Sequence, residues 1–270
     1  MRPVPERTSA VGELCAGLRV QCRVIVALVI RDMMMRHGRA NVGFLWVILE
    51  PMILTAAIML MWSLVKSPYE HGLAIVALVL TGYMPLTLFR HMTNVGPMLY
   101  RRSVPFLYHR HITFIDVLVA RTFLEFAGTT AALIVVYSVL VLANVVNPIR
   151  DPGPVMLGWG LMALLSFGLA SVLAVATEMS EAMERFIPPF QYLMLPLSGA
   201  FYMLDWLPTA VADIAWYMPT VHCYELFRAG FFGEDVVTHY AIWYPLAWAS
   251  GLTAIGLASI DRIRDRVHTG

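Results

Sequence analysis

Long runs of apolar residues recur along this chain and constrain its fold more than any other feature of the sequence. The hydrocarbon core of a bilayer is about 30 Å thick, and a helix needs about 20 mostly apolar residues to cross it. Of the 270 residues, 59% are apolar and 14% are charged, whereas about a quarter of the residues in a soluble domain are charged. The sequence therefore predicts an all-α, polytopic membrane protein.

Six transmembrane helices fit the positions of the apolar runs. We place them, to within a few residues, at residues 42–65, 73–95, 113–143, 154–177, 187–204 and 240–260. The second and fifth contain Pro85 and Pro196, which neighbouring helices must accommodate.

Residues 11–37 are expected to form a helix that does not cross the membrane, because its apolar run, Val24 to Met35, is only about 12 residues long and is interrupted by Arg31 and Asp32. Arg19 and Arg23 share one helical face, and apolar residues occupy another. That apolar face consists of Leu14, Leu18, Ile25 and Val29. This pattern favours an amphipathic helix lying in the membrane interface. We therefore divide the chain into a cytoplasmic N-terminal segment, residues 1–40, and a transmembrane domain, residues 41–270.

Basic residues are distributed unevenly between the predicted loops. With the N-terminus inside, 14 of the 19 Lys and Arg residues lie on the cytoplasmic side, three lie outside, and Arg90 and Arg121 lie within spans. Because positive charge is retained in cytoplasmic loops, both termini are predicted to be cytoplasmic. The net charge of +1 gives no indication of nucleic-acid binding.

The predicted outer loop, residues 205–239, is too rich in Trp, Tyr and Phe to be a solvated connection. Pro208 and Pro219 each suit the first turn of a short helix. Two short re-entrant helices between the fifth and sixth spans would explain this composition, because irregular backbone is tolerated at membrane depth where protein buries it.

Motifs for catalysis and cofactor binding are missing from the sequence. A phosphate-binding loop needs Gly-Lys-Ser/Thr, but the only lysine, Lys66, follows Val65. There is no His-Glu-x-x-His helix and no Gly-x-Ser-x-Gly elbow. The cysteines Cys15, Cys22 and Cys223 have no metal-ligand spacing. The sequence predicts a protein that is not an enzyme and holds no metal or cofactor of its own.

Ionisable residues within the predicted spans are the remaining functional signal, because charge in lipid costs a few kcal/mol. Glu50, followed by Pro51, either lines a functional path or sits solvated among the headgroups. Arg121 and Glu125 are four residues apart, so they either form a structural pair or face a polar path. Arg90, near the inner end of its span, either faces that path or extends to the interface.

Three motifs lie in order along the chain: RDMMMRHGRANVGFLWVILEP, IDVLVARTFLE and MPTVHCYELFRAGFF. They resemble the ABC-2-type permeases that export bacterial polysaccharides, most closely the KpsM-type membrane subunit of group 2 capsular polysaccharide exporters. Members often carry a basic residue where this chain has Met33 to Met35. The matching residues are Arg31, Arg36, Gly38, Gly43, Leu45, Trp46, Glu50 and Pro51, then Ile115, Asp116, Ala120, Arg121, Leu124 and Glu125, then Pro219, Val221, His222, Glu225, Leu226 and Arg228.

The resemblance implies a permease in the bacterial inner membrane that works as a homodimer with two copies of a separate ATPase, which would bind ATP and Mg. Its substrate would be a lipid-linked, acidic capsular polysaccharide. A periplasmic polysaccharide co-polymerase and an outer-membrane export protein would carry the polymer onward. An O-antigen or teichoic-acid exporter is the alternative in the same class, and a membrane transferase or a channel without an ATPase is the alternative outside it.

Three groups of site residues are predicted on these grounds. The predicted substrate path combines charged residues with aromatic side chains whose faces stack on sugar rings. Trp and Tyr near span ends also serve as interfacial anchors, which is the alternative for the aromatic residues. The path residues are Arg36, Trp46, Glu50, Tyr83, Arg90, Arg121, Glu125, Tyr192 and Tyr202. An outer gate is predicted at three residues that share a helical face and pair with each other or with the second protomer; a purely structural pair is the alternative. These residues are His222, Glu225 and Arg228.

The third group is a cytoplasmic contact for the ATPase between the second and third spans. Mixed aromatic and Arg residues suit a protein–protein contact, although basic segments beside a membrane also bind anionic lipid. The predicted contact residues are Tyr100, Arg101, Arg102, Phe106, Tyr108 and Arg110.

Overall fold

The computed structural model describes residues 10–36, 43–67, 69–97, 99 and 112–267. This part of the chain is almost entirely helical and contains one short antiparallel hairpin, in which Tyr69 pairs with Ala74 and Glu70 with Leu73. In chain order the elements are α1 (Ala10–Arg36), α2 (Gly43–Val65), β1 (Tyr69–Glu70), β2 (Leu73–Ala74), α3 (Ile75–Thr93), α5 (Phe114–Leu142), α6 (Pro152–Met179), α7 (Glu181–Leu197), η1 (Leu204–Trp206), α8 (Thr209–Trp216), α9 (Pro219–Phe232), η2 (Gly233–Asp235) and α10 (Trp243–Val267).

Within the described residues, four helices are long and apolar enough to cross a membrane: α3, α5, α6 and residues Leu45–Val65 of α2. They coincide with the first four predicted spans to within three residues at each end. The prediction of a polytopic, all-α membrane protein is confirmed at these four positions.

The fifth and sixth predicted spans correspond to helices of a different character. α7 has only 17 residues, three of them proline, and at 1.5 Å per residue it is shorter than the hydrocarbon core. It ends at Leu197, whereas the predicted span continued to residue 204. α10 has 25 residues, but Asp and Arg are frequent in its last two turns. Both segments are helical, but α7 is shorter than the other four helices and α10 carries more charge than they do.

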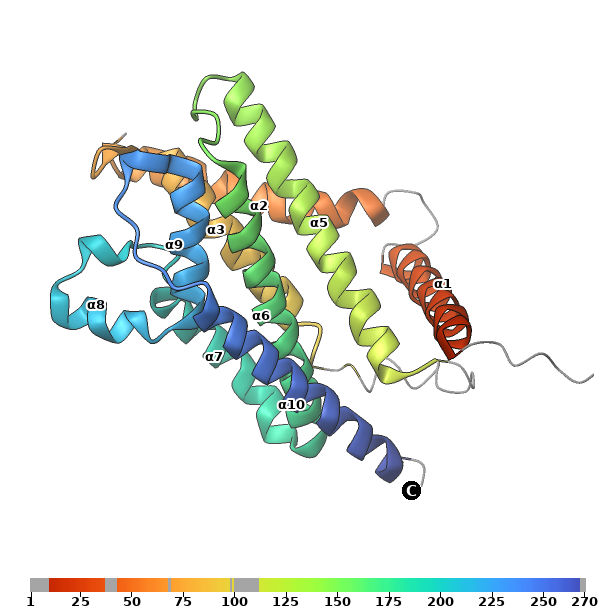
Figure 1. Cartoon of the computed structure of the whole chain (residues 1–270). Coiled ribbons are helices and arrows are strands. Elements are labelled where there is room, and N and C mark those ends of the chain that lie inside the picture. The colour runs from red at the N-terminus through yellow and green to blue at the C-terminus, as the bar shows by residue number, and fades with distance from the viewer. Residues whose placement is uncertain (1–9, 37–42, 68, 98, 100–111, 268–270) are drawn as a thin grey trace, which may run out of the picture.

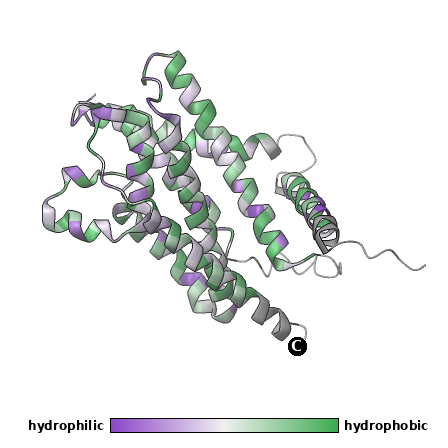
Figure 2. Cartoon of the chain, viewed as in Figure 1, coloured by the Kyte–Doolittle hydropathy of each residue, from purple (hydrophilic) through white to green (hydrophobic). Residues whose placement is uncertain are grey.

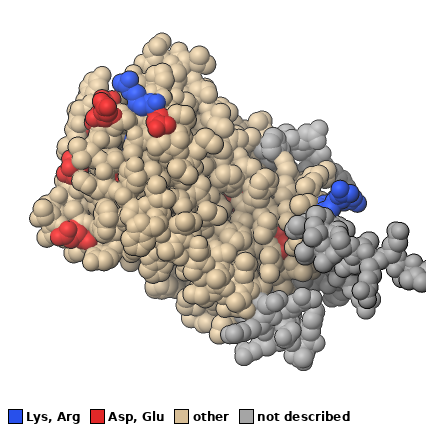
Figure 3. All heavy atoms as spheres, in the orientation of Figure 1, with Lys and Arg blue, Asp and Glu red and all other residues tan. Residues whose placement is uncertain are grey.

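The surface carries an apolar band between two charged ends. Hydrophobic residues cover most of α5 and α6, with hydrophilic residues mainly in the connections (Figure 2). On the face shown in Figure 3, Lys, Arg, Asp and Glu gather toward the two ends, and the surface between them is almost free of charge. An apolar band of this kind suits the hydrocarbon region of a bilayer.

The core centres on α3 and α6, which are the most buried of the four long helices. One hydrophobic cluster joins α3, α6 and α9, and a second joins α1, α5 and the far end of α6. α6 packs closely on α9 because Gly158 has no side chain: a Cβ there would lie 2.8 Å from the backbone N of Phe227. α10 lies along the other side of α6 (Figure 1).

The two ends of the molecule are built from different elements. The α1 end contains the C-terminus of α3, the N-terminus of α5 and α1 itself, which lies at the edge of the molecule beside α5 (Figure 1). The hairpin end contains β1, β2 and the connection between α5 and α6.

The predicted N-terminal helix is confirmed, and its apolar face has a defined contact. Ile25 and Val29 pack with buried Leu28 against the cluster that includes α5. Val26 and Ile30, on the other side of α1, are exposed. α1 therefore presents apolar residues to its surroundings as well as to the protein.

The two predicted short helices are present as α8 and α9. Pro219 is the first residue of α9, as predicted, whereas Pro208 directly precedes α8 and caps it with its carbonyl group. α9 is buried along nearly its whole length, while α8 is mostly exposed. The apolar composition of residues 205–239 is explained in large part by α9, which is part of the protein core.

Candidate functional site

One predicted group of functional residues lies outside the described part of the chain. It is the proposed ATPase contact, comprising Tyr100, Arg101, Arg102, Phe106, Tyr108 and Arg110. The side chain of Arg36 is outside it as well. These assignments stay predictions, and the structure places the remaining site residues.

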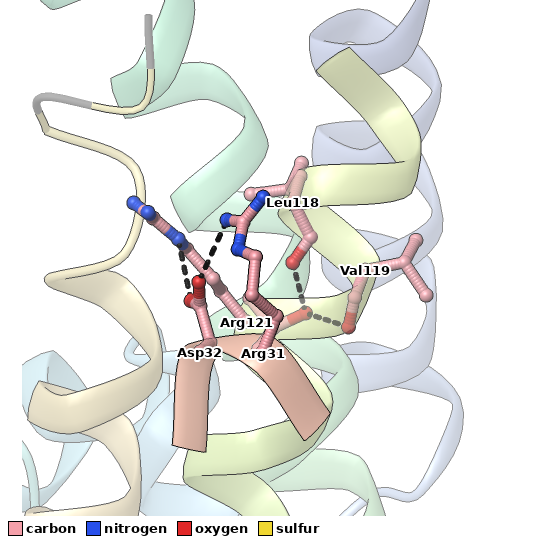
Figure 4. Close-up of polar contacts among 6 residues, drawn as sticks. Arg31, Asp32, Leu118, Val119 and Arg121 are labelled. Atoms are coloured by element: carbon pink, nitrogen blue, oxygen red, sulfur yellow. Dashed lines mark hydrogen bonds and ion pairs between the residues drawn. The ribbon is translucent and has the colours of Figure 1, made fainter. Parts of the chain in front are cut away.

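Arg121 of α5 forms an ion pair with Asp32 of α1 (Figure 4). The Nε atom of Arg121 lies 2.9 Å from Oδ2 of Asp32, and each side chain is 11% exposed. The other carboxylate oxygen of Asp32 accepts a hydrogen bond from Arg31 at 3.2 Å. This arrangement differs from the predicted pair between Arg121 and Glu125, because the carboxylate comes from a helix 89 residues earlier in the chain.

A second polar contact joins α1 to the first turn of α5. The side-chain amide of Gln21 donates to Oδ1 of Asp116 at 3.1 Å. Asp116 also completes a capping box with Thr113, in which each side chain accepts from the backbone N–H of the other. α1 is thus attached to the start of α5 at two points, through Gln21 and through Asp32.

Glu125 connects α5 to α3. Its Oε2 atom lies 3.4 Å from Nδ1 of His91, and Glu125 is buried. Glu125 lies one helical turn from Arg121 on α5. Each of these two predicted path residues contacts a neighbouring helix: Glu125 contacts α3, and Arg121 contacts α1.

Polar side chains also join the end of α3 to α7, in an arrangement we call the α3–α7 seam: Arg90, Thr93 and Asn94 with Gln191 and Tyr192. The amide of Gln191 donates to Oδ1 of Asn94 at 2.7 Å and to the hydroxyl of Thr93 at 3.4 Å. The guanidinium carbon of Arg90 lies 5.7 Å from the centre of the Tyr192 ring. The seam brings together Arg90 and Tyr192, which were predicted for the substrate path on separate grounds.

The three predicted gate residues of α9 are buried and bind backbone groups of this chain. Arg228 donates to the carbonyl oxygens of Gly199, Ala200 and Tyr202 at 2.9, 2.6 and 2.5 Å. These carbonyls belong to the irregular segment after α7, where they have no helical partner. Arg228 therefore satisfies the backbone at the point where α7 ends.

Glu225 and His222 fix two further segments to α9. The carboxylate of Glu225 accepts from the backbone N–H groups of Leu204 and His239, each at 3.0 Å. Burial raises the pKa of Glu225, against the opposing effect of these two donors. Nδ1 of His222 accepts from the N–H of Ala241 at 3.1 Å, so its Nε2 donates to the carbonyl of Trp216 at 2.8 Å.

The neutral form of His222 is required by this arrangement, because an imidazolium has no acceptor. Burial lowers the pKa of His222 below its ordinary value, which favours the same neutral form. The shared face of His222, Glu225 and Arg228 is confirmed, but all three are nearly inaccessible and bind the backbone of their own chain. The structure thus shows these side chains bound within their own chain, and the outer gate stays a prediction.

The predicted aromatic residues occupy different environments. Trp46 and Tyr192 are 43% and 64% exposed, and the hydroxyl of Tyr202 donates to the carbonyl of Leu197 at 3.0 Å. Tyr83 lines a narrow hollow together with three aromatic residues that were not predicted, Trp62, Phe201 and Trp206. The Trp62 and Phe201 rings are stacked with centres 5.7 Å apart.

Glu50 lies on an exposed face of α2, close in sequence to exposed Trp46 and Ile53, while Pro51 is buried. Functional candidates that the sequence prediction missed include Asp32, His91 and Gln191. Asp32 and His91 are ionisable residues near the ends of apolar runs, and that signal would have been sufficient to select them. In the described part of the chain, no three His, Cys, Asp or Glu side chains gather as metal ligands would.

Comparison with known proteins relates this geometry to a family. A family model described as ABC-2 type transporter matches residues 23–232, which include Asp32, Arg121 and α9. The chain is 36% identical over 252 residues to the capsule polysaccharide export inner-membrane protein CtrC of Neisseria meningitidis serogroup B, covering 93% of this chain and 95% of CtrC.

Two further relatives cover similar shares of the sequence. The capsule polysaccharide export inner-membrane protein BexB of Haemophilus influenzae is 32% identical over 244 residues, which is 90% of this chain and 92% of BexB. The polysialic acid transport protein KpsM of Escherichia coli is 23% identical over 235 residues, which is 86% of this chain and 91% of KpsM.

Proposed function

Since the chain belongs to the ABC-2 type transporter family, we propose that it is the permease subunit of an exporter that moves capsular polysaccharide across the bacterial inner membrane. The observation that carries the proposal is the match, over nine tenths of the chain, to relatives named for capsule polysaccharide export. The apolar band and the four candidate spans support a location in the membrane.

The proposed topology has six spans with both termini in the cytoplasm. α7 and α10 complete the set of spans, and α8 and α9 form the re-entrant segment between them. α7 is too short to cross the bilayer as a straight helix by itself. The irregular segment that follows it is satisfied by Arg228, which allows such backbone to lie at membrane depth.

The proposed assembly is a homodimer with two copies of a separate ATPase that binds ATP and Mg. The lack of a phosphate-binding loop in this sequence supports a separate ATPase. Residues 100–110 are the proposed contact, and a periplasmic co-polymerase and an outer-membrane protein are the proposed partners beyond the inner membrane. The substrate is proposed to be lipid-linked and acidic.

The experiment is deletion of the gene in its host, with complementation by the wild type. We expect polysaccharide to be absent from the cell surface and to accumulate inside, because synthesis continues while export stops. Complementation should restore the surface polymer. A normal capsule in the deletion strain, or loss of O-antigen or teichoic acid with the capsule intact, would contradict the proposal.

A further inference from the structure

The four helices that qualify as membrane spans contain two arginines, and these have very different surroundings. Arg121 is neutralised by Asp32 through an ion pair of 2.9 Å. Arg90, at the end of α3, has no ion pair with any acidic side chain of the described residues, and its neighbour on α7 is the ring of Tyr192. Among the described residues, one of the two charges is therefore compensated by a carboxylate and the other is not.

The Arg90 guanidinium also retains hydrogen-bonding capacity. Its Nε atom is buried without an acceptor, although the residue as a whole is only half-buried. Buried polar atoms are normally hydrogen-bonded, so the protein leaves part of the donor capacity of Arg90 unused. A ring face such as that of Tyr192 attracts the cation but is not a substitute for the two oxygens of a carboxylate or phosphate.

Polar residues around Arg90 form a stripe along one face of α3. Tyr83, Thr87, Arg90 and Asn94 follow one another at spacings of four, three and four, so they share a face of α3. At the α1 end this stripe meets α7 through the Gln191–Asn94 hydrogen bond. Thr87 and Asn94 are neutral, so Arg90 is the only full charge on the stripe.

We propose that Arg90, supported by Tyr192 in the α3–α7 seam, is a binding site for an oxyanion of the transported glycolipid, a sugar carboxylate or a phosphate. The inference rests on the proposed function and makes one residue responsible for recognising acidic substrate. Arg121 then has a different role, which is to attach α1 to α5. A single uncompensated guanidinium binds an anion weakly enough to release it, as transport of a long polymer requires.

The test uses the permease with its ATPase in vesicles of phosphatidylcholine. ATP hydrolysis is measured against a titration of a uronic-acid oligosaccharide and of the same oligosaccharide with its carboxyl groups reduced to alcohols. We expect the acidic form to stimulate the wild type and Arg90→Gln to raise the half-maximal concentration about tenfold, the loss of one charge-assisted bidentate contact. The maximal rate should stay close to that of the wild type.

Matched variants separate recognition from folding. Arg90→Lys keeps the charge but not the planar fork, so it should fall between the wild type and Arg90→Gln. Arg150→Gln removes an arginine that is mostly exposed and should change nothing. If Arg90→Gln does not fold, Arg90→Lys alone decides the question, and an unchanged half-maximal concentration in that variant overturns the proposal.

The remaining outcomes are distinguishable. Equal stimulation of wild type and Arg90→Gln by the acidic oligosaccharide would refute the role of Arg90. A difference that appears only when phosphatidylglycerol is added, without oligosaccharide, would assign Arg90 to membrane lipid and also refute it. A phosphorylated oligosaccharide tested in parallel identifies which oxyanion binds. A wild type that no oligosaccharide stimulates would contradict the proposed function itself, and the inference would fall with it.

Discussion

The ion pair between Asp32 and Arg121 should stabilise the docking of α1 on α5, and a double-mutant cycle measures this directly. The variants are Asp32→Leu, Arg121→Met and the double change. Each single change leaves a charge in a site where both side chains are only 11% exposed. The double change removes both charges and replaces them with apolar side chains of similar length.

The expected loss of stability depends on the burial of the pair and on Arg31, which also bonds Asp32. Removing one partner of a buried ion pair costs about 3–5 kcal/mol, whereas replacing both is often close to neutral. Asp32→Leu takes the carboxylate from two arginines, but Arg121→Met leaves Asp32 bonded to Arg31. We therefore expect Asp32→Leu to be the more destabilising change, and a coupling energy of about 2–3 kcal/mol.

The assay is the free energy of unfolding of the purified protein, measured by SDS titration for all four proteins of the cycle. The matched control is the same cycle at Arg150 and Asp235, an exposed pair 3.8 Å apart, where the coupling should be within about 1 kcal/mol. If the two single changes at Asp32 and Arg121 add without coupling, then the pair does not hold α1 to α5 and the reasoning from burial is wrong.

Three further outcomes are expected in the same unfolding assay. Arg228→Lys should cost about 3 kcal/mol, because an ammonium cannot reach all three carbonyls that the guanidinium binds; an unchanged stability would contradict this. Gly82→Ala should be strongly destabilising because its methyl group would overlap the carbonyl oxygen of Ala200, whereas Gly160→Ala, which meets nothing within 4 Å, should be close to neutral; equal effects would refute the packing argument. Because burial lowers the pKa of His222, its contribution to stability is present above the ordinary value of about 6.5 and is lost as the pH falls through the lowered value. His222→Gln keeps one donor and one acceptor, so it should weaken this dependence on pH, and an identical pH profile would count against it.

The long helices could be predicted well because their signal is local. A run of about 20 apolar residues can satisfy its backbone in lipid only as a helix, so the boundaries of α2 and α5 followed from composition alone. α7 was harder to place because Pro188 and Pro189 and the charges in its first turns interrupt that signal. Its true end is set by the contact of the following segment with Arg228 of α9, which no local pattern contains.

The partners of charged residues could not be predicted from spacing within one helix. A separation of four residues shows that Arg121 and Glu125 face the same side of α5, and it predicts nothing about which helices pack there. α1 brings Asp32 to one of them, and α3 brings His91 to the other. Tertiary packing decides between these partners, and here a carboxylate on a neighbouring helix approaches the guanidinium side-on, 2.9 Å from its Nε atom.

The same limit explains why the contacts of the predicted gate residues on α9 could not be predicted from the sequence. The spacing of His222, Glu225 and Arg228 correctly gave a common face, and polar residues on an apolar helix do need partners. Their partners are backbone N–H and C=O groups. Almost every residue carries these groups, so a sequence pattern cannot show which of them a side chain binds. Irregular segments such as the one after α7 are rich in unsatisfied backbone groups. A buried arginine or carboxylate beside a predicted break in a span is thus better interpreted first as a backbone partner, and as half of an ion pair only when an opposite charge is shown beside it.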